Sequence, residues 1–194
     1  TALDSVEAGG INNTTIGNHS GTAITTGDYN TALGSLSLES NTTAGNNTAI
    51  GGAALRCNTT GCENTSVGSG SMTVNISGDN NTALGRFALS SNTTADNNTA
   101  VGFCSLFANT TGANNTAVGR EALTANTTGA TNSAFGNYAL YSNTTANDNM
   151  AFGYNALGLN TTGTNNVAMG RDALLNNTTA SDNTAIGKDS LRTN

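Results

Sequence analysis

The chain of 194 residues has no proline and no tryptophan, and only 9% of its residues are charged and 5% aromatic. The missing proline, with no three-residue glycine period, excludes a collagen-like helix. A net charge of -6 argues against disorder through self-repulsion, and the chain lacks the basic stripe of a nucleic-acid-binding protein. No apolar run approaches the roughly 20 residues of a membrane span. Three cysteines are too few for a disulfide scaffold.

Asparagine and threonine are abundant instead. The chain has 32 Asn, 34 Thr and 24 Gly. These residues are poor helix formers, and they favour turns and strands. The composition therefore predicts an all-β protein.

The sequence repeats with a period of 17 residues from Asn13 onward, without insertion or deletion. The consensus is N-T-A-Φ-G-x-x-A-L-x-x-N-T-T-[GA]-x-N, where Φ is a large apolar residue, and its positions are numbered 1 to 17 from the first Asn. Position 1 is always Asn: Asn13, Asn30, Asn47, Asn64, Asn81, Asn98, Asn115, Asn132, Asn149, Asn166 and Asn183. Position 5 is always Gly: Gly17, Gly34, Gly51, Gly68, Gly85, Gly102, Gly119, Gly136, Gly153, Gly170 and Gly187. Position 4 is always apolar: Ile16, Leu33, Ile50, Val67, Leu84, Val101, Val118, Phe135, Phe152, Met169 and Ile186.

A strict period of this length predicts a parallel β-solenoid (a β-helix or β-roll) with one repeat per coil and about 11 coils. Seventeen residues are too few for two packed helices or a propeller blade, but they suffice for two or three short strands. At about 4.8 Å per coil the rod would be roughly 55 Å long. We expect an irregular N-terminal coil at residues 1–12, where Ala2 and Leu3 resemble positions 8 and 9, and the solenoid at residues 13–194.

Each repeat position has an expected role. Positions 2–4 and 8–9 are predicted as strands, and positions 12–14 as a third strand or a corner. Gly at position 5 suits a turn with positive φ or close backbone contact, and Asn at positions 1 and 12 suits ladders of side-chain hydrogen bonds. If the apolar residue at position 4 and Leu at position 9 fill the lumen, the alanines at positions 3 and 8 point outward or sit at corners, because strand side chains alternate. An outward alanine column would suit packing against another chain.

The ends of the repeat array raise the question of assembly. The repeat stops at Asn194 in mid-coil, and neither end shows a polar capping element. Unpaired strand edges pair with other chains. The sequence is therefore interpreted either as a segment of a longer protein or as a unit whose ends meet other copies in a head-to-tail polymer.

Few side chains could carry out catalysis or bind a metal, and the sequence predicts no catalytic residue, no metal and no cofactor. The single histidine, His19, stands alone in an irregular coil. A disulfide between Cys57 and Cys62 is one interpretation of C-N-T-T-G-C, and free thiols are the other; Cys104 is expected to be a small packing residue. The acidic residues at positions 7, 16 and 17 are interpreted as turn residues rather than a calcium ladder, because they do not provide a fixed ligand set in consecutive coils and the nonapeptide calcium-binding pattern is absent: Asp28, Glu63, Asp79, Asp96, Glu121, Asp148, Asp172, Asp182 and Asp189.

The residues at positions 12 and 14 form columns that suggest modification or surface binding. Sequons at position 12 would allow glycosylation along one edge if their side chains face outward: Asn41, Asn58, Asn75, Asn92, Asn109, Asn126, Asn143, Asn160 and Asn177. The alternative is that the fold itself requires Asn-Thr-Thr. A threonine column at position 14 is typical of ice-binding solenoids, but the neighbouring threonines at position 13 should face the opposite way.

The stretch NTAVGREALTANTTGATNSAFG, from Asn115 to Gly136, resembles repeats of phage and bacterial tail-fibre proteins. Its A-Φ-G core also resembles head repeats of trimeric autotransporter adhesins. The resemblance covers nearly the whole chain, from about Asn13 to Asn194. It implies an extracellular, usually trimeric, β-rich shaft or head.

The sequence therefore predicts a non-enzymatic structural subunit of an extracellular fibre or filament, on a cell or virion surface. Its expected partner is itself, with glycans as a further option and no nucleic acid or membrane span. The first alternative is a fragment of a trimeric tail fibre or adhesin that binds a cell-surface ligand, and a minor alternative is an ice-binding solenoid. Ligand contacts would then come from positions 6 and 7, where the repeat varies: Arg86, Phe87, Phe103, Arg120, Tyr138, Tyr154 and Arg171.

Overall fold

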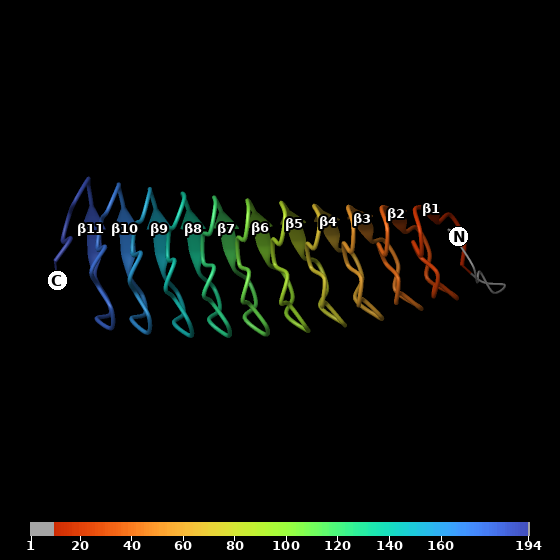
Figure 1. Cartoon of the computed structure of the whole chain (residues 1–194). Helices are drawn as coiled ribbons and strands as arrows, with labels where there is room; N and C mark the ends of the chain where they lie inside the picture. Colours follow the sequence, from red (N-terminus) through yellow and green to blue (C-terminus); the bar gives the residue numbers. More distant parts are fainter. Residues whose placement is uncertain (1–9, 194) are drawn as a thin grey trace.

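The computed structural model describes residues 10–193 and shows the predicted parallel β-solenoid (Figure 1). Each repeat forms one coil with one three-residue strand, and the strands make a single sheet in sequence order. The strands are β1 (Thr14–Ile16), β2 (Thr31–Leu33), β3 (Thr48–Ile50), β4 (Thr65–Val67), β5 (Thr82–Leu84), β6 (Thr99–Val101), β7 (Thr116–Val118), β8 (Ser133–Phe135), β9 (Met150–Phe152), β10 (Val167–Met169) and β11 (Thr184–Ile186). The expected coil at residues 1–12 falls largely outside this range, as do Ala2 and Leu3.

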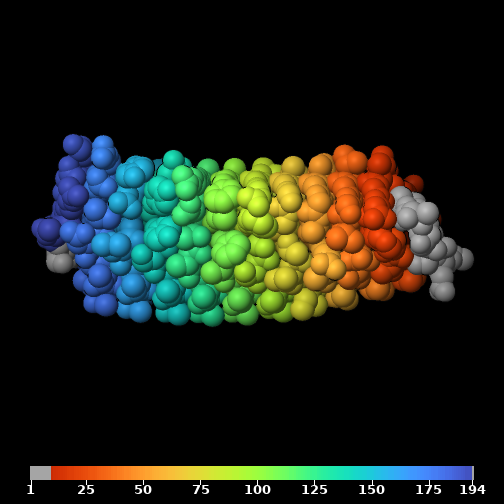
Figure 2. Space-filling view, viewed as in Figure 1, coloured from red at the N-terminus to blue at the C-terminus, as the bar shows by residue number. Residues whose placement is uncertain are grey.

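Each strand from β1 to β10 pairs in register with the same repeat positions of the strand that follows it. Ala100 lies opposite Ala117, and Val101 lies opposite Val118. Backbone hydrogen bonds between coils continue beyond the strands, for example from Leu106 N to Ala122 O at 3.0 Å. Because each coil has the same length, stacking produces a straight rod of nearly constant width (Figure 2).

The sequence prediction of two or three strands per coil is wrong, since residues 10–193 form one strand per coil. The run over positions 6–11 consists of turns. Within it, positions 7 and 9 have positive φ, as in Glu121 (54°) and Leu123 (51°). A left-handed residue cannot continue an extended strand, so positions 8–9 form a turned wall opposite the sheet, and positions 12–14 form a corner.

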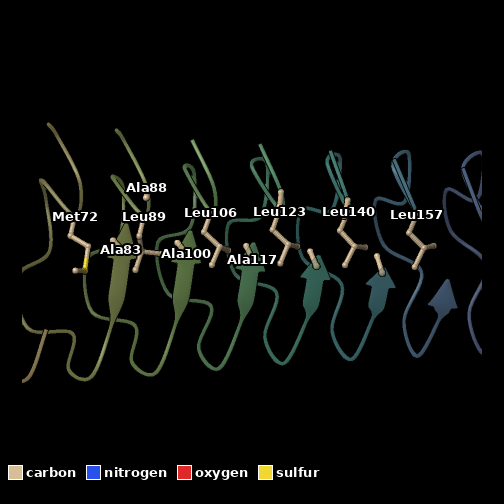
Figure 3. Packing of buried hydrophobic residues seen from close by; sticks show 14 of the residues in the cluster. Met72, Ala83, Ala88, Leu89, Ala100, Leu106, Ala117, Leu123, Leu140 and Leu157 are labelled. Carbon is tan, nitrogen blue, oxygen red and sulfur yellow. The ribbon is translucent and has the colours of Figure 1, made fainter. Parts of the chain in front are cut away.

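The lumen is filled by alanine and leucine. Ala at position 3 points inward from the sheet and meets Leu at position 9 from the opposite wall (Figure 3). Ala or Ser at position 8 is also buried, except near the C-terminal end. Leu at position 9 fills the lumen as expected, but the expectation that position 4 joins it there while the alanines point outward or sit at corners is wrong. The two walls stand so close that alanine and leucine together fill the space.

The first described coil fills its lumen differently. Gly21 replaces the leucine at position 9 and Ile24 replaces the asparagine at position 12, and Ile24 is fully buried. A Cβ at Gly21 would lie 3.1 Å from Ile24 Cδ1. Ile24 therefore occupies part of the volume that leucine fills in other coils.

The left-handed residue at position 17 allows a stability prediction. This position is Asn in several coils, including Asn114 with φ 60°, but it is the β-branched Thr131 with φ 59° in the next coil. Asparagine tolerates this conformation better than threonine. We expect Thr131→Asn to stabilise the chain by about 1 kcal/mol, measured from guanidinium chloride unfolding.

Asn114→Thr is the matched reverse exchange, and it should lose stability by a similar amount. A Thr131→Asn variant that is less stable than the parent would contradict this explanation.

Candidate functional site: the outer sheet face

Two asparagine ladders hold the coils in register from inside. At position 12, Asn126 Nδ2 donates to Asn109 Oδ1 at 2.9 Å and to Gly129 O at 2.8 Å. At position 1, Asn115 Nδ2 donates to the same Gly129 O at 2.8 Å, while its Oδ1 accepts the backbone N–H of Asn132 at 2.9 Å. The backbone carbonyl of Gly129 thus accepts hydrogen bonds from both asparagines of its coil. The two predicted asparagine ladders are confirmed.

The condition for glycosylation at position 12, that the side chains face outward, is not met in the folded chain. The position-12 side chains are buried, and the amide nitrogen that a glycan would modify already donates hydrogen bonds. This holds for Asn41, Asn58, Asn75, Asn92, Asn109, Asn126, Asn143, Asn160 and Asn177. In these coils the asparagine therefore serves the corner itself.

The two threonine columns beside the position-12 ladder, at positions 13 and 14, differ in their contacts. At position 13, Thr127 Oγ1 donates to Thr144 O at 3.1 Å in the next coil. At position 14, Thr128 is exposed, as are the other residues of its column. The column at position 14 is thus a single exposed row of hydroxyl groups.

The cysteines are free thiols in the structure, so the disulfide between Cys57 and Cys62 is not formed there. The corner that it would close is already held by Asn58 Nδ2, which donates to Gly61 O at 2.8 Å. Burial raises the pKa of the Cys104 thiol, and the nearby Glu121 carboxylate adds to the increase. Cys104 therefore suits packing better than reaction as a thiolate.

The acidic side chains and His19 do not gather into a centre. Among residues 10–193, no three His, Cys, Asp or Glu side chains are grouped as metal ligands would be. Some acidic side chains at position 16 act instead as backbone caps between coils: Asp79 Oδ1 accepts the N–H of Cys62 at 2.7 Å, and Asp96 Oδ1 accepts that of Asp79 at 2.8 Å.

The main unexplained surface is the outer sheet face, defined as positions 2 and 4 of strands β1–β11. In every strand the middle residue is buried, and its two neighbours are exposed or half-buried. Position 4 therefore places a continuous apolar column on the outside of the rod. A column of eleven large apolar side chains along one sheet is uncommon on a monomer surface, and apolar patches of this kind are typical of interaction sites.

The outer sheet face is most apolar at β8–β10. There Met150 and Val167 replace the usual threonine at position 2. Phe135 and Phe152 stack with ring centroids 4.3 Å apart and an interplanar angle of 18°. Sequence reasoning missed this face because it placed the largest apolar residues inside.

The predicted contact residues at positions 6 and 7 lie on the turns that follow the strands. Arg86 Cζ lies 4.3 Å from the centroid of the Phe87 ring, and Arg120 Cζ lies 5.5 Å from that of Tyr138. The Arg120 guanidinium donates a hydrogen bond to the Glu121 carboxylate at 3.0 Å, which raises the pKa of Arg120, so Arg120 stays charged. All six Lys and Arg residues of the chain occupy position 6 or 10: Arg56, Arg86, Arg120, Arg171, Lys188 and Arg192.

Residues 10–193 present no pocket and no helix long and apolar enough to cross a membrane. Comparison with models of protein families, with curated proteins and with solved structures gives no match.

Proposed function

We propose that the chain is a structural rod of an extracellular fibre, and that copies associate laterally through the outer sheet face. The observation that carries this proposal is the apolar column at position 4, which faces away from the lumen along all eleven strands. Burial of such side chains in a partner removes apolar surface from water, which is the main driving force of association.

The size and the period of this face both favour a second copy as the partner. From strand spacing and rise per residue, the face measures about 50 Å by 10 Å. A pair of copies would bury about 1,000 Å² in total, which is the lower limit of a specific interface. A second copy has the same spacing between strands, so apolar side chains can meet at every coil.

Head-to-tail stacking is the other mode of assembly in the proposal. Among the described residues, β1 pairs only with β2 and β11 pairs only with β10. Edges of this kind accept another strand. The two modes differ in outcome, because lateral pairing through one face closes while end stacking continues.

The lateral mode is tested by replacing position-4 residues with threonine, which suits an exposed strand. In the quadruple variant Val101→Thr, Val118→Thr, Phe135→Thr and Phe152→Thr, we expect monomers by light scattering where the parent forms dimers or trimers. The thermal unfolding of the diluted monomer should change little, because these side chains are outside the lumen.

The matched control replaces exposed apolar residues elsewhere: Val74→Thr, Ile76→Thr and Leu159→Thr. It should assemble like the parent. A monomeric parent, or a quadruple variant that still associates, would refute lateral pairing. In electron micrographs, long rods that persist in the quadruple variant would show end stacking instead.

A further inference from the structure

A row of arginine and tyrosine side chains crosses four successive coils outside the outer sheet face. It consists of Arg120, Tyr138, Tyr154 and Arg171, which follow β7, β8, β9 and β10, and we call it the Arg–Tyr row. Arg120 Cζ lies 5.5 Å from the Tyr138 ring centroid, the two tyrosine rings are 6.0 Å apart, and Arg171 Cζ lies 5.6 Å from the Tyr154 ring centroid. Tyr141 flanks the row, 5.7 Å from Tyr138.

The fold does not require these side chains. The corresponding positions after β3 are Gly52 and Ala53, and those after β4 are Ser69 and Gly70. The backbone there makes the same hydrogen bonds: Ala53 N to Ser35 O is 2.8 Å, and Tyr138 N to Arg120 O is 3.0 Å. Because small residues support the same coil, these side chains are not needed for folding and are available for another role.

The row offers hydrogen-bond donors and acceptors without excess charge. Arg120 Nη2 lies 2.9 Å from Glu121 Oε1, and Arg171 Nε lies 3.2 Å from Asp172 Oδ2. The two arginine side chains remain more than half exposed, so their N–H groups are accessible to a ligand. Two charge-balanced pairs do not favour a polyanion, and the chain as a whole has a net charge of -6.

The shape and polarity of the row narrow the class of ligand. Residues 10–193 have no pocket, so a small molecule would stay mostly solvated. The row extends over three coil steps, about 14 Å along the rod, and Tyr154 and Tyr141 are exposed beside the charged pairs. It is too short and too polar to be the core of a protein interface.

We infer that the Arg–Tyr row binds a neutral polysaccharide that lies along the rod axis. Sugar hydroxyl groups both donate and accept hydrogen bonds, which matches guanidinium–carboxylate pairs. The apolar C–H faces of sugar rings match the exposed tyrosine rings. This inference does not depend on lateral association, because the row lies outside the outer sheet face.

Tyrosine fluorescence gives a direct readout. The chain has no Trp and four Tyr, of which Tyr138, Tyr141 and Tyr154 lie at the row. Titration of the whole chain with soluble xylan, galactomannan and dextran should change this emission with at least one of the three, and polygalacturonate should bind more weakly. Affinity electrophoresis in gels containing the same polymers provides the second measurement.

The variant Tyr138→Ala with Tyr154→Ser introduces residues that other coils already have at these positions, so it should fold. We expect it to weaken polysaccharide binding by about tenfold or more, as truncation of central aromatic contacts does. The control Tyr29→Ser removes an exposed tyrosine at position 17, away from the row, and should bind like the parent.

Three results would overturn the inference: no binding to any of the three neutral polymers, equal or tighter binding of polygalacturonate, or unchanged binding by the row variant. The quadruple variant of the outer sheet face should retain binding. Its behaviour separates failure of this inference from failure of the assembly proposal.

Discussion

Replacing Gly51 by alanine is expected to destabilise the rod by more than about 3 kcal/mol, beyond the range of most single substitutions. A Cβ at Gly51 would lie 2.7 Å from the carbonyl carbon and oxygen of Gly68 in the next coil, and Gly51 has φ +130°. The backbone conformation alone costs a non-glycine residue about 1–3 kcal/mol. The contact with backbone atoms adds to this, because the next coil cannot move without breaking its own stacking. Guanidinium chloride unfolding measures the loss.

Gly52, the next residue, provides a matched control in the same coil. A Cβ there would have no neighbour nearer than 4.0 Å, and its φ is outside the left-handed range. Gly52→Ala should therefore be neutral or should stabilise the chain by up to about 1 kcal/mol. A third variant, Gly187→Ala, separates the two causes, since Gly187 has φ +119° but no described atom within 4 Å of a Cβ. Equal losses for Gly51→Ala and Gly187→Ala would show that contact between coils is unimportant.

Breaking the position-12 ladder in mid-rod should have a comparable effect. Asn126→Ile removes two donated bonds, to Asn109 Oδ1 and Gly129 O, and one bond accepted from Asn143 Nδ2. A buried polar group that loses its partner costs about 1–3 kcal/mol, and a branched side chain beside a full-length leucine adds about 1–3 kcal/mol of overpacking. We expect a total loss of about 4 kcal/mol in chemical unfolding, while Thr128→Ile at an exposed position should change stability by less than about 0.5 kcal/mol.

The first coil suggests how part of this loss can be recovered. There Ile24 extends into the volume left by Gly21, so Leu123→Gly should make room for the isoleucine of Asn126→Ile. The double variant should lose about 2 kcal/mol less than the sum of the two single losses, since residues that share a cavity are not additive. Strict additivity would contradict this account of the first coil.

The stacking was predictable from the sequence, while the direction of the side chains was only partly so. A period of 17 without insertions leaves in-register parallel pairing as the simplest way to align identical positions. The sequence did contain the information that sets the direction of the strand side chains, but the large size of the apolar residue at position 4 favoured the opposite prediction. If Asn at position 1 is buried in a ladder, alternation also places position 3 inside and positions 2 and 4 outside.

Two features depend on the stack and not on local preference. Leu at position 9 has positive φ, as in Leu106 (49°) and Leu140 (51°), a conformation that leucine rarely adopts. Hydrogen bonds between coils and burial in the lumen outweigh this preference. The apolar residues at positions 8 and 9 therefore wrongly predicted a strand. The Arg–Tyr row likewise requires the alignment of separate coils, although its members were identified as departures from the repeat.

Identical register between all neighbours has a consequence for variation in length. Residues 115–131 contact the coils on either side through the same repeat positions that those two coils would use with each other. Loss or duplication of a whole repeat, as in unequal recombination between similar DNA segments, would therefore leave every remaining junction intact. A change of one residue would displace every later side chain around the coil. The gene can thus lengthen or shorten the protein in whole-coil steps. Selection can thereby change the length of the rod without requiring a new interface between coils.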